Sequence, residues 1–152
     1  METMIRKVQQ GDANALAYIQ TESWKAAFAG ILDAEMLAKC TDIDRATAMY
    51  QRLLDENKGN GYLLTVNEKP HCIAYWDAAR DPEFAGKAEL ICIHSLPDNW
   101  HKGFGSQMMD FVLDDIKKAG YSEVVLWVFR DNLRARAFYE AKGFILKGTA
   151  RP

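Results

Sequence analysis

The sequence is poor in cysteine, and its three cysteines do not follow the pattern of a disulfide-bonded or zinc-binding protein. Cys40, Cys72 and Cys92 are odd in number and have no framework spacing, so we expect three reduced thiols. His71 and His94 lie close to two of these cysteines in the sequence. Structural zinc sites, however, usually have paired C-x2-C or H-x3-H spacing, which is absent here. We therefore expect no metal site.

Long apolar stretches and an excess of charge are also absent. No apolar stretch reaches about 18 residues, so no transmembrane span is expected. The N-terminus has no apolar core of a signal peptide, which predicts a cytoplasmic protein. A net charge of −2, with no run of more than two Lys or Arg, argues against nucleic acid as the main partner. The length of 152 residues predicts one domain covering residues 1–152.

The first half of the chain contains signals for both helices and strands. We expect strands at 3–8, 61–66 and 71–76, and helical regions at 12–30 and 33–57. Asp12 is the predicted N-cap of the first helix, and the second helical region should be interrupted near Thr41. The polar segment 67–70 is the predicted turn between the two later strands.

The second half is more regular and alternates strands with helices. We expect strands at 88–96, 124–129 and 144–147, and helices at 104–120 and 132–143. The segment 124–129 is continuously apolar, which is typical of a strand covered on both faces. Strand–helix–strand succession from 88 to 129 predicts a right-handed parallel unit. The fold class is therefore α/β with a mixed sheet.

A glycine-rich loop follows the strand at 88–96 and leads into a helix. Gly103 and Gly105 allow the backbone to approach an anion closely, and His101 and Lys102 add positive charge. Together with Phe104 and Ser106 at the start of the helix, these residues predict a phosphate or pyrophosphate site. The alternative is an ordinary tight turn. The loop matches neither the G-x-G-x-x-G dinucleotide fingerprint nor the P-loop.

A second block near the C-terminus changes the balance between these alternatives. Asn132, Ala135, Phe138, Tyr139, Gly143 and Phe144 follow the pattern N-x-x-A-x-x-F-Y-x-x-x-G-F, and Gly103 and Gly105 match [QR]-x-x-G-x-[GA] at a helix start. With these two motifs the chain resembles the GNAT superfamily of N-acetyltransferases. The resemblance implies a GNAT-like fold: a central, mostly antiparallel mixed sheet with one parallel splayed pair, flanked by helices. It also implies acetyl-coenzyme A (acetyl-CoA) as co-substrate, without a metal.

The sequence departs from the family pattern in two respects. Trp100 replaces the usual Gln or Arg, which is tolerable because the backbone provides most of the pyrophosphate contacts. The family usually has one more strand, inserted between those at 124–129 and 144–147, and this sequence contains no segment for it. Unpaired edges invite pairing with another chain. We therefore hypothesise a homodimer in which the C-terminal segments help to complete the sheet.

The resemblance also assigns roles to residues on the strand at 88–96. Backbone groups of Ile93, His94 and Ser95 would hold the pantetheine arm, and the Ile93 N–H would bind the thioester carbonyl. Two residues are candidates for the general base. Glu89 has the spacing of the catalytic glutamate in similar enzymes, or is a surface residue. His94 faces the other side of a regular strand, unless a bulge changes the alternation.

Tyr139 is the predicted general acid that protonates the departing thiolate, as in similar enzymes. Asn132 can cap its helix and also reach the cofactor, whereas Phe138 is either a cofactor contact or part of the core. The aromatic residues predicted to line the acceptor pocket, or else to belong to the core, are Trp24, Phe28, Tyr75 and Trp76.

The expected activity is transfer of an acetyl group from acetyl-CoA to a primary amine of a small molecule, peptide or protein. Transfer is expected to occur by direct attack in a ternary complex. Two alternatives remain at this point. One is a module that binds CoA but is catalytically inactive, and the other is an interaction domain in which Gly103–Gly105 is only a turn.

Overall fold

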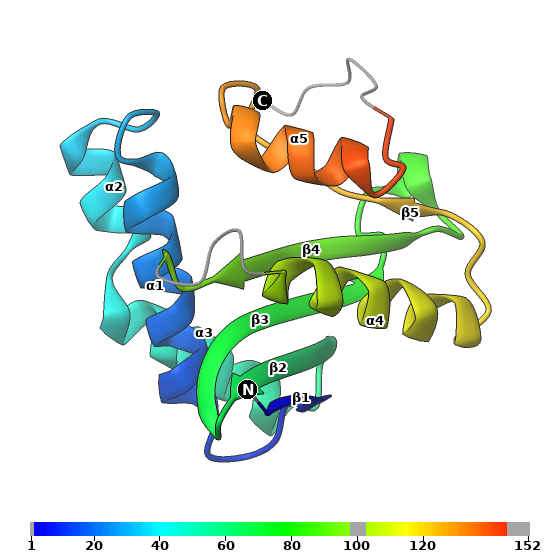
Figure 1. Cartoon of the computed structure of the whole chain (residues 1–152), viewed down its shortest axis with the longest axis horizontal. Helices are drawn as coiled ribbons and strands as arrows, with labels where there is room; N and C mark the ends of the chain where they lie inside the picture. Colours follow the sequence, from blue (N-terminus) through cyan, green and yellow to red (C-terminus); the bar gives the residue numbers. More distant parts are fainter. Residues whose placement is uncertain (1, 98–102, 146–152) are drawn as a thin grey trace.

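The computed structural model describes residues 2–97 and 103–145. These residues form one mixed sheet with helices on both faces (Figure 1). The strand order is β1-β2-β3-β4-β5, antiparallel from β1 to β4 and parallel between β4 and β5. The strands are β1 (Thr3–Lys7), β2 (Asn60–Val66), β3 (Lys69–Ala78), β4 (Ala88–Ser95) and β5 (Val124–Val125). This confirms the expected mixed, mostly antiparallel sheet.

Five α-helices and one short 3-10 helix are present in the described part of the chain. They are α1 (Ala13–Phe28), α2 (Ala34–Cys40), α3 (Ile43–Asp55), η1 (Pro82–Phe84), α4 (Phe104–Lys118) and α5 (Leu133–Ala141). The break between α2 and α3 falls where the sequence predicted it. It is fixed by Asp42, whose carboxylate accepts hydrogen bonds from the N–H groups of Asp44 and Arg45 and so caps α3.

Asp12 precedes α1 as predicted, but its side chain does not cap the helix. Its carboxylate instead accepts two hydrogen bonds from the Arg6 guanidinium, at 2.8 and 2.9 Å, and one from the Gln9 N–H at 2.9 Å. The predicted N-cap position is therefore confirmed, whereas the capping hydrogen bond is replaced by the pair with Arg6. A bidentate Arg–carboxylate pair is stronger than a single neutral hydrogen bond, and here it ties β1 to the start of α1.

The β2–β3 hairpin is tighter than expected. Val66 pairs directly with Lys69, so the turn consists of Asn67 and Glu68 rather than the four residues 67–70. Asn67 and Glu68 have φ angles of 52° and 70°, as in the two-residue turns that match strand twist. The register then shifts between Leu64 and Thr65, opposite Pro70, which has no N–H to donate.

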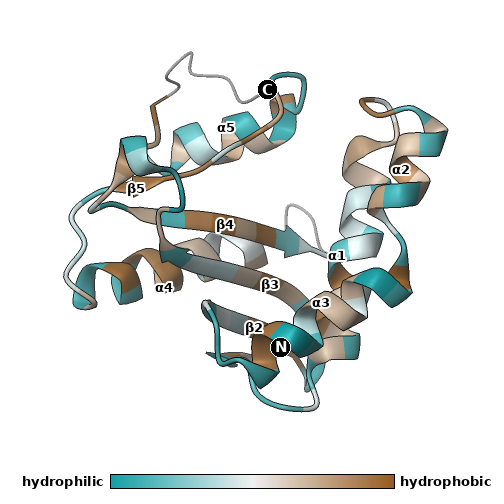
Figure 2. Cartoon of the chain, turned by 180° about the vertical axis from the view of Figure 1, so that it is seen from behind, coloured by the Kyte–Doolittle hydropathy of each residue, from teal (hydrophilic) through white to brown (hydrophobic). Residues whose placement is uncertain are grey.

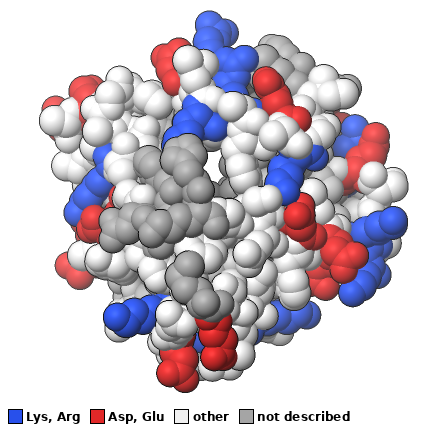
Figure 3. All heavy atoms as spheres, viewed as in Figure 1, with Lys and Arg blue, Asp and Glu red and all other residues white. Residues whose placement is uncertain are grey.

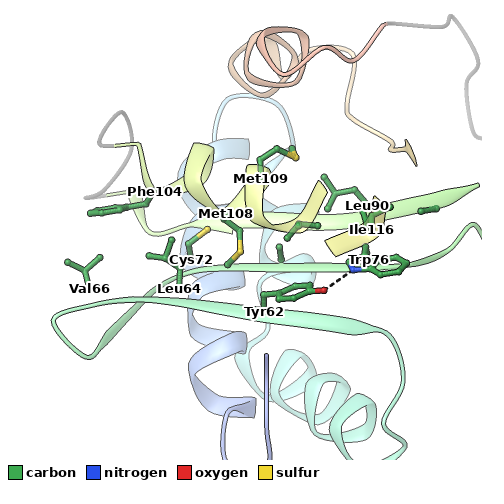
Figure 4. Close-up of a cluster of buried hydrophobic side chains, with 13 residues drawn as sticks. Tyr62, Leu64, Val66, Cys72, Trp76, Leu90, Phe104, Met108, Met109 and Ile116 are labelled. Atoms are coloured by element: carbon green, nitrogen blue, oxygen red, sulfur yellow. Dashed lines mark hydrogen bonds between the residues drawn. The ribbon is translucent and has the colours of Figure 1, made fainter. Parts of the chain in front are cut away.

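Two apolar clusters hold the helices against the sheet. The cluster under α4 is shown in Figure 4 and includes the stripe Phe104, Met108, Val112 and Ile116 that the sequence predicted. In the same cluster the Trp76 Nε1–H donates to the Tyr62 hydroxyl at 3.0 Å. The second cluster joins α1 and α3 to the opposite face of the sheet and includes Leu16, Ile19, Tyr50, Leu63, Ile73 and Tyr75. Figure 2 shows the same layers coloured by hydropathy.

The C-terminal part differs most from the expectation. Only Val124 and Val125 pair with β4, through Ala88 and Glu89, so the strand predicted at 124–129 is much shorter. Residues 126–128 are half-buried and Phe129 is exposed, so this segment is not covered on both faces. After α5, Phe144 and Ile145 are not in a strand, and the rest of the predicted strand at 144–147 lies outside the described residues.

Candidate active site

A β-bulge in β4 determines which side chains and N–H groups face the site. Tyr75 pairs with Cys92 and Trp76 pairs with Leu90, so Ile91 has no partner on β3. The bulge reverses the alternation: Leu90 and Ile93 both pack on the α4 side, and Cys92 packs on the α1 and α3 side. This is the bulge that the sequence analysis left open. It places Glu89 and His94 on the same face, because their partners are Asp77 and Ile73.

The bulge also turns the backbone. The Ala88 N–H donates to the backbone carbonyl of Glu123, on the β5 side, at 3.0 Å. The Leu96 N–H donates to the backbone carbonyl of His71, on the β3 side, at 2.9 Å. Since N–H groups alternate along a strand, the Ile93 and Ser95 N–H groups point away from β3. They face the side on which β5 has already ended. This is the side on which the family resemblance implies donors to the pantetheine arm.

A cavity of about 1500 Å³ occupies the space beside β4 beyond the end of β5. One wall is β4 from Ile91 to Ser95, and the other is formed by the segment 127–130 and α5. Because the paired part of β5 stops opposite Glu89, the two walls diverge beyond this point (Figure 1). The cavity extends from the N-terminus of α4 to residues of α1 and α3.

Gly103 is the N-cap of α4 and has a φ angle of 84°, a left-handed conformation that a side chain would strain. Because Gly103 has no side chain, it offers no acceptor to the first-turn N–H groups of α4. Gly103, Gly105 and Ser106 line the cavity. Phe104 is buried in the core instead. Positions 101 and 102 were also predicted to bind the cofactor, and they lie outside the described residues.

Asn132 and Phe138 connect α5 to the cavity. Asn132 is buried, and its Oδ1 accepts a hydrogen bond from the Ala135 N–H at 3.2 Å, so it caps α5 as expected. The Phe138 side chain is partly buried against the cluster under α4, and it also lines the cavity. A Cβ atom on Gly105 would lie 3.7 Å from the Phe138 ring and 3.8 Å from Ser95 Oγ, so these groups meet at the glycine loop.

Tyr139 lines the cavity from α5 and packs against Phe138 and Phe144, with ring centroids 5.6 and 6.0 Å apart. Burial raises its pKa to about 12, with a further increase from Cys92 across the cavity and a decrease from Arg134. At neutral pH the hydroxyl is therefore protonated and able to donate a proton or a hydrogen bond.

His94 lies on the α1 side of β4, where its Nε2 accepts a hydrogen bond from Trp24 Nε1–H at 3.3 Å. Burial lowers the pKa of His94 to about 4, so the imidazole is neutral at physiological pH. With Nε2 accepting, the proton is assigned to Nδ1. His94 is therefore a weak base, and the lone pair of its unprotonated nitrogen already accepts the hydrogen bond from Trp24.

Glu89 is not at the surface: it is 2% exposed, and it is not among the residues that line the cavity. Its carboxylate accepts hydrogen bonds from Arg80, namely from Nε at 3.2 Å, from the terminal nitrogen at 2.6 Å and from the backbone N–H at 3.1 Å. The interpretation of Glu89 as a surface residue is therefore wrong, whereas its role as a general base stays a prediction. The charge-assisted pair fixes the loop after β3 against β4.

The predicted acceptor-pocket aromatics divide into two groups. Trp24, Phe28 and Tyr75 line the cavity, with the Trp24 and Phe28 rings 4.7 Å apart. Trp76 does not, because it belongs to the core cluster under α4. Core packing was the stated alternative, and it is correct for Trp76.

Sequence reasoning missed a polar group where α1, α3 and β4 meet. Tyr50 donates its hydroxyl to Gln20 Oε1 and also interacts with the Cys92 thiol. Burial raises the pKa of Cys92 to about 12, so this thiol is protonated and is a poor nucleophile. The four-residue spacing of Ala46 and Tyr50 on α3 indicates a buried helix face in the sequence. It does not indicate which groups the Tyr50 hydroxyl would contact.

Within residues 2–97 and 103–145 no three His, Cys, Asp or Glu side chains gather in a way that could bind a metal ion. None of the helices in this part of the chain is both long and apolar enough to cross a membrane.

Comparison with known proteins identifies the fold and the kind of chemistry. Residues 20–144 match the Acetyltransferase (GNAT) family. The chain is 27% identical to a spermidine N(1)-acetyltransferase of Thermoplasma acidophilum over 98% of this chain and 92% of that relative. It is 30% identical to the [Ribosomal protein bS18]-alanine N-acetyltransferase of Escherichia coli, over 62% of each chain.

The crystal structure of PaiA N-acetyltransferase from Thermoplasma acidophilum, determined with coenzyme A, superposes with a TM-score of 0.85 at 25% identity. It covers 99% of this chain and 94% of that one. The sheet, the glycine N-cap of α4 and the match over residues 20–144 lead to one conclusion. The chain belongs to the GNAT family of acetyltransferases.

Proposed function

We propose that the protein transfers the acetyl group of acetyl-CoA directly to a primary amine within a ternary complex. The observation that carries the proposal is the cavity between β4 and α5, with the glycine N-cap of α4 at one end and Tyr139 on its wall. The coenzyme A bound to the similar PaiA structure supports acetyl-CoA as co-substrate.

The cofactor would bind along two sets of backbone donors. The first-turn N–H groups of α4 around Gly105 and Ser106, with the positive end of the helix dipole, suit the pyrophosphate. The outward N–H groups of Ile93 and Ser95 suit the pantetheine arm and the thioester carbonyl. A donor at the thioester oxygen stabilises the tetrahedral oxyanion by about 3 kcal/mol.

The chemical step then needs proton movements at the amine and at the thiolate. An ammonium group has no lone pair, so one proton first leaves the amine to solvent. The neutral nitrogen attacks the thioester carbonyl carbon, the C–S bond breaks, and Tyr139 donates its proton to the leaving thiolate. The nitrogen loses a second proton, and solvent returns one to the Tyr139 oxygen. His94 and Glu89, the two candidate bases, are respectively a weak base bonded to Trp24 and a carboxylate paired with Arg80. The site therefore suits an amine that loses its proton easily.

The test is the release of CoA from acetyl-CoA in the presence of a panel of primary amines, with mass spectrometry of the amine. Acetylated amine formed together with CoA supports the proposal. Tight binding of acetyl-CoA in calorimetry, without product from any amine, would instead favour the inactive CoA-binding module. The engagement of both candidate bases is the observation that favours this second function.

We also propose that two copies associate through the C-terminal edge of the sheet. Within the described residues β5 has only two residues and ends the strand order, and Ile145 after α5 is 81% exposed. A short edge strand and an exposed apolar side chain are both suited to contact with a second chain. Light scattering at high micromolar concentration should report a dimer, and a monomer would refute this proposal.

A further inference from the structure

Aromatic side chains join the two walls of the cavity on the side of α1. Phe129, from the segment 127–130, lies with its ring centroid 5.1 Å from that of Phe28 on α1. The Trp24 ring lies 4.7 Å from that of Phe28 and 6.3 Å from that of His94 on β4. The planes of these pairs meet at 66° to 78°, the edge-to-face arrangement that aromatic rings prefer. All four residues line the cavity, as an aromatic bridge from one wall to the other.

The aromatic bridge lies close to the proposed contact of the thioester. The Trp24 Nε1–H donates to His94 Nε2 at 3.3 Å, and His94 directly follows Ile93, whose N–H is that contact. The proposed pyrophosphate site is at the N-terminus of α4, and the cavity extends from there to residues of α1 and α3. An acceptor amine must reach the thioester from the part of the cavity that the cofactor leaves open. This part is on the side of the aromatic bridge.

The cavity is mainly apolar around the aromatic bridge. Two polar groups near it are already paired within the protein, because the Trp24 N–H donates to His94 and the Tyr50 hydroxyl donates to Gln20 Oε1. Apolar residues of α1, α3 and β4 also line the cavity here, among them Ala27, Met49, Leu53 and Ile91. A substituent of the acceptor bound at this place therefore gains most if it is apolar.

The charges of the cavity do not suit a polyamine. Within the described residues its lining contains one acidic residue against five basic ones, namely Asp77, Lys58, Arg80, Arg130, Arg134 and Arg136. Asp77 Oδ1 already accepts a hydrogen bond from the Ala78 N–H at 2.8 Å. Even with arginines engaged by the phosphates of CoA, a second ammonium group would find a single carboxylate, whose charge also interacts with Arg80. Over the face shown in Figure 3, by contrast, acidic and basic residues are both spread.

We infer that the acceptor is a primary amine joined by a short linker to an aromatic ring, without a second charge, and that Phe28 and Phe129 bind this ring. The inference rests on the proposed function and names its substrate class. Phe129 is 44% exposed, so its ring has surface left for a ligand beside Phe28. A further ring continues the edge-to-face cluster and gains more than apolar burial alone. Apolar surroundings also favour the neutral form of the amine, which suits a site whose two candidate bases are both paired.

The test is calorimetric titration of the CoA complex of the full chain with phenethylamine, ethylamine and 1,4-diaminobutane. The first two differ only in the phenyl ring, and the third carries a second ammonium group in place of a ring. We expect phenethylamine to bind at least about tenfold more tightly than either of the others, because only its ring is buried against the aromatic bridge.

Phe129→Ala should weaken the binding of phenethylamine by about fivefold or more and leave the affinity for CoA unchanged, because it removes one face of the ring site and no cofactor contact. Phe111→Ala is the matched control and should change neither affinity. Phe111 is 43% exposed and packs edge to face on Tyr62, and it is not among the residues that line the cavity. Melting temperatures verify that the variants fold.

Phe129→Glu tests the charge argument at the same position. It should weaken phenethylamine as Phe129→Ala does, and it should strengthen the binding of 1,4-diaminobutane by about twofold or more, since it supplies a carboxylate for the second ammonium group. Weaker binding of 1,4-diaminobutane to this variant than to the parent would contradict the charge argument.

Three results would overturn the inference: equal binding of phenethylamine and ethylamine to the parent, tighter binding of 1,4-diaminobutane than of phenethylamine, or phenethylamine binding that Phe129→Ala leaves unchanged. An equal loss of CoA affinity in Phe129→Ala would do so too, because Phe129 would then be a cofactor contact. If binding follows the expectation but the parent acetylates no amine, the aromatic subsite stands and the proposed function fails. If the parent acetylates other amines but does not bind phenethylamine at millimolar concentration, the proposed function stands and this inference fails.

Discussion

The two walls of the active-site cavity are built differently. The wall formed by β4 belongs to a sheet packed on both faces, with Leu64, Ile73 and Met108 fully buried. The wall formed by α5 has no fully buried side chain, and β5 beneath it contributes two residues to the sheet. The two walls therefore differ in how deeply their side chains are buried.

The second wall is held by contacts of α5 with α4 and by ring contacts of Trp127 with Phe84 and of Phe129 with Phe28. Phe138, Tyr139 and Phe144 pack partly against the α4 cluster, and Lys142 forms an ion pair with Asp110 of α4 at 2.9 Å. We therefore expect substitutions in the first wall to affect folding and substitutions in the second wall to affect binding and turnover.

The largest effect is expected from Leu64→Ala on β2, in the core of the sheet to which the first wall belongs. Removing a fully buried leucine should lower the free energy of unfolding by about 2–5 kcal/mol, whereas Leu133→Ala on α5 should change it by less than about 0.5 kcal/mol. Leu133 is 68% exposed and provides the matched control. Urea unfolding measures both, and equal losses would contradict the difference between the walls.

Tyr139→Phe should lower kcat by about 100-fold while changing the affinity for CoA little, because a general acid acts in the transition state. Tyr121→Phe, in which the ring lies against Trp76 away from the cavity, is the control. Steady-state kinetics and calorimetry separate the two quantities. Unchanged turnover would leave Tyr139 a purely structural residue.

Gly103→Val should weaken CoA binding by about tenfold or more, since a β-branched residue cannot hold the left-handed N-cap beside a pyrophosphate. Gly120, after the other end of α4, has a similar φ angle of 99° and equally open surroundings. Gly120→Val therefore imposes comparable backbone strain without touching the cavity. If both variants bind CoA equally in calorimetry, the anion site is not at the glycine loop.

The smallest effect concerns pH. The pKa of His94 in the folded protein is about 4, below its ordinary value of 6.5, because burial disfavours the charged form. Its contribution to stability is complete above pH 6.5 and is lost as the pH falls from 6.5 toward 4.

Between pH 7 and pH 5 we expect the parent to lose about 1 kcal/mol more than His94→Gln, allowing for solvent screening of a partly buried imidazole. Urea unfolding at the two pH values measures this. Identical pH dependence in both proteins would show that His94 does not titrate in this range.

Features encoded by local patterns were predictable from the sequence. The helix 104–118 and the strand before it follow from apolar periodicity and from the glycines at their junction, and the family motifs placed Tyr139 and Asn132 at the cavity. Features set by long-range pairing were not. The shortening of 124–129 depends on where β4 and β5 separate, which no residue in that apolar run indicates.

The same distinction applies within the site. The bulge at Ile91 is visible only in the β3–β4 register, so the face of His94 remained open in the sequence. Arg80 and Glu89 are nine residues apart, and only the fold shows that they pair and that Arg80, but not Glu89, lines the cavity. Asp12 is the N-cap residue of α1 as predicted, but its side chain does not cap the helix, because its carboxylate is paired with Arg6.

The most direct test of the account is amine-dependent release of CoA from acetyl-CoA, measured with a panel of primary amines and with the product identified by mass spectrometry. The account predicts CoA and N-acetylated amine in equal amounts, with rates that fall strongly in Tyr139→Phe. Binding of acetyl-CoA without acetylation of any amine, or turnover that Tyr139→Phe leaves intact, would contradict it.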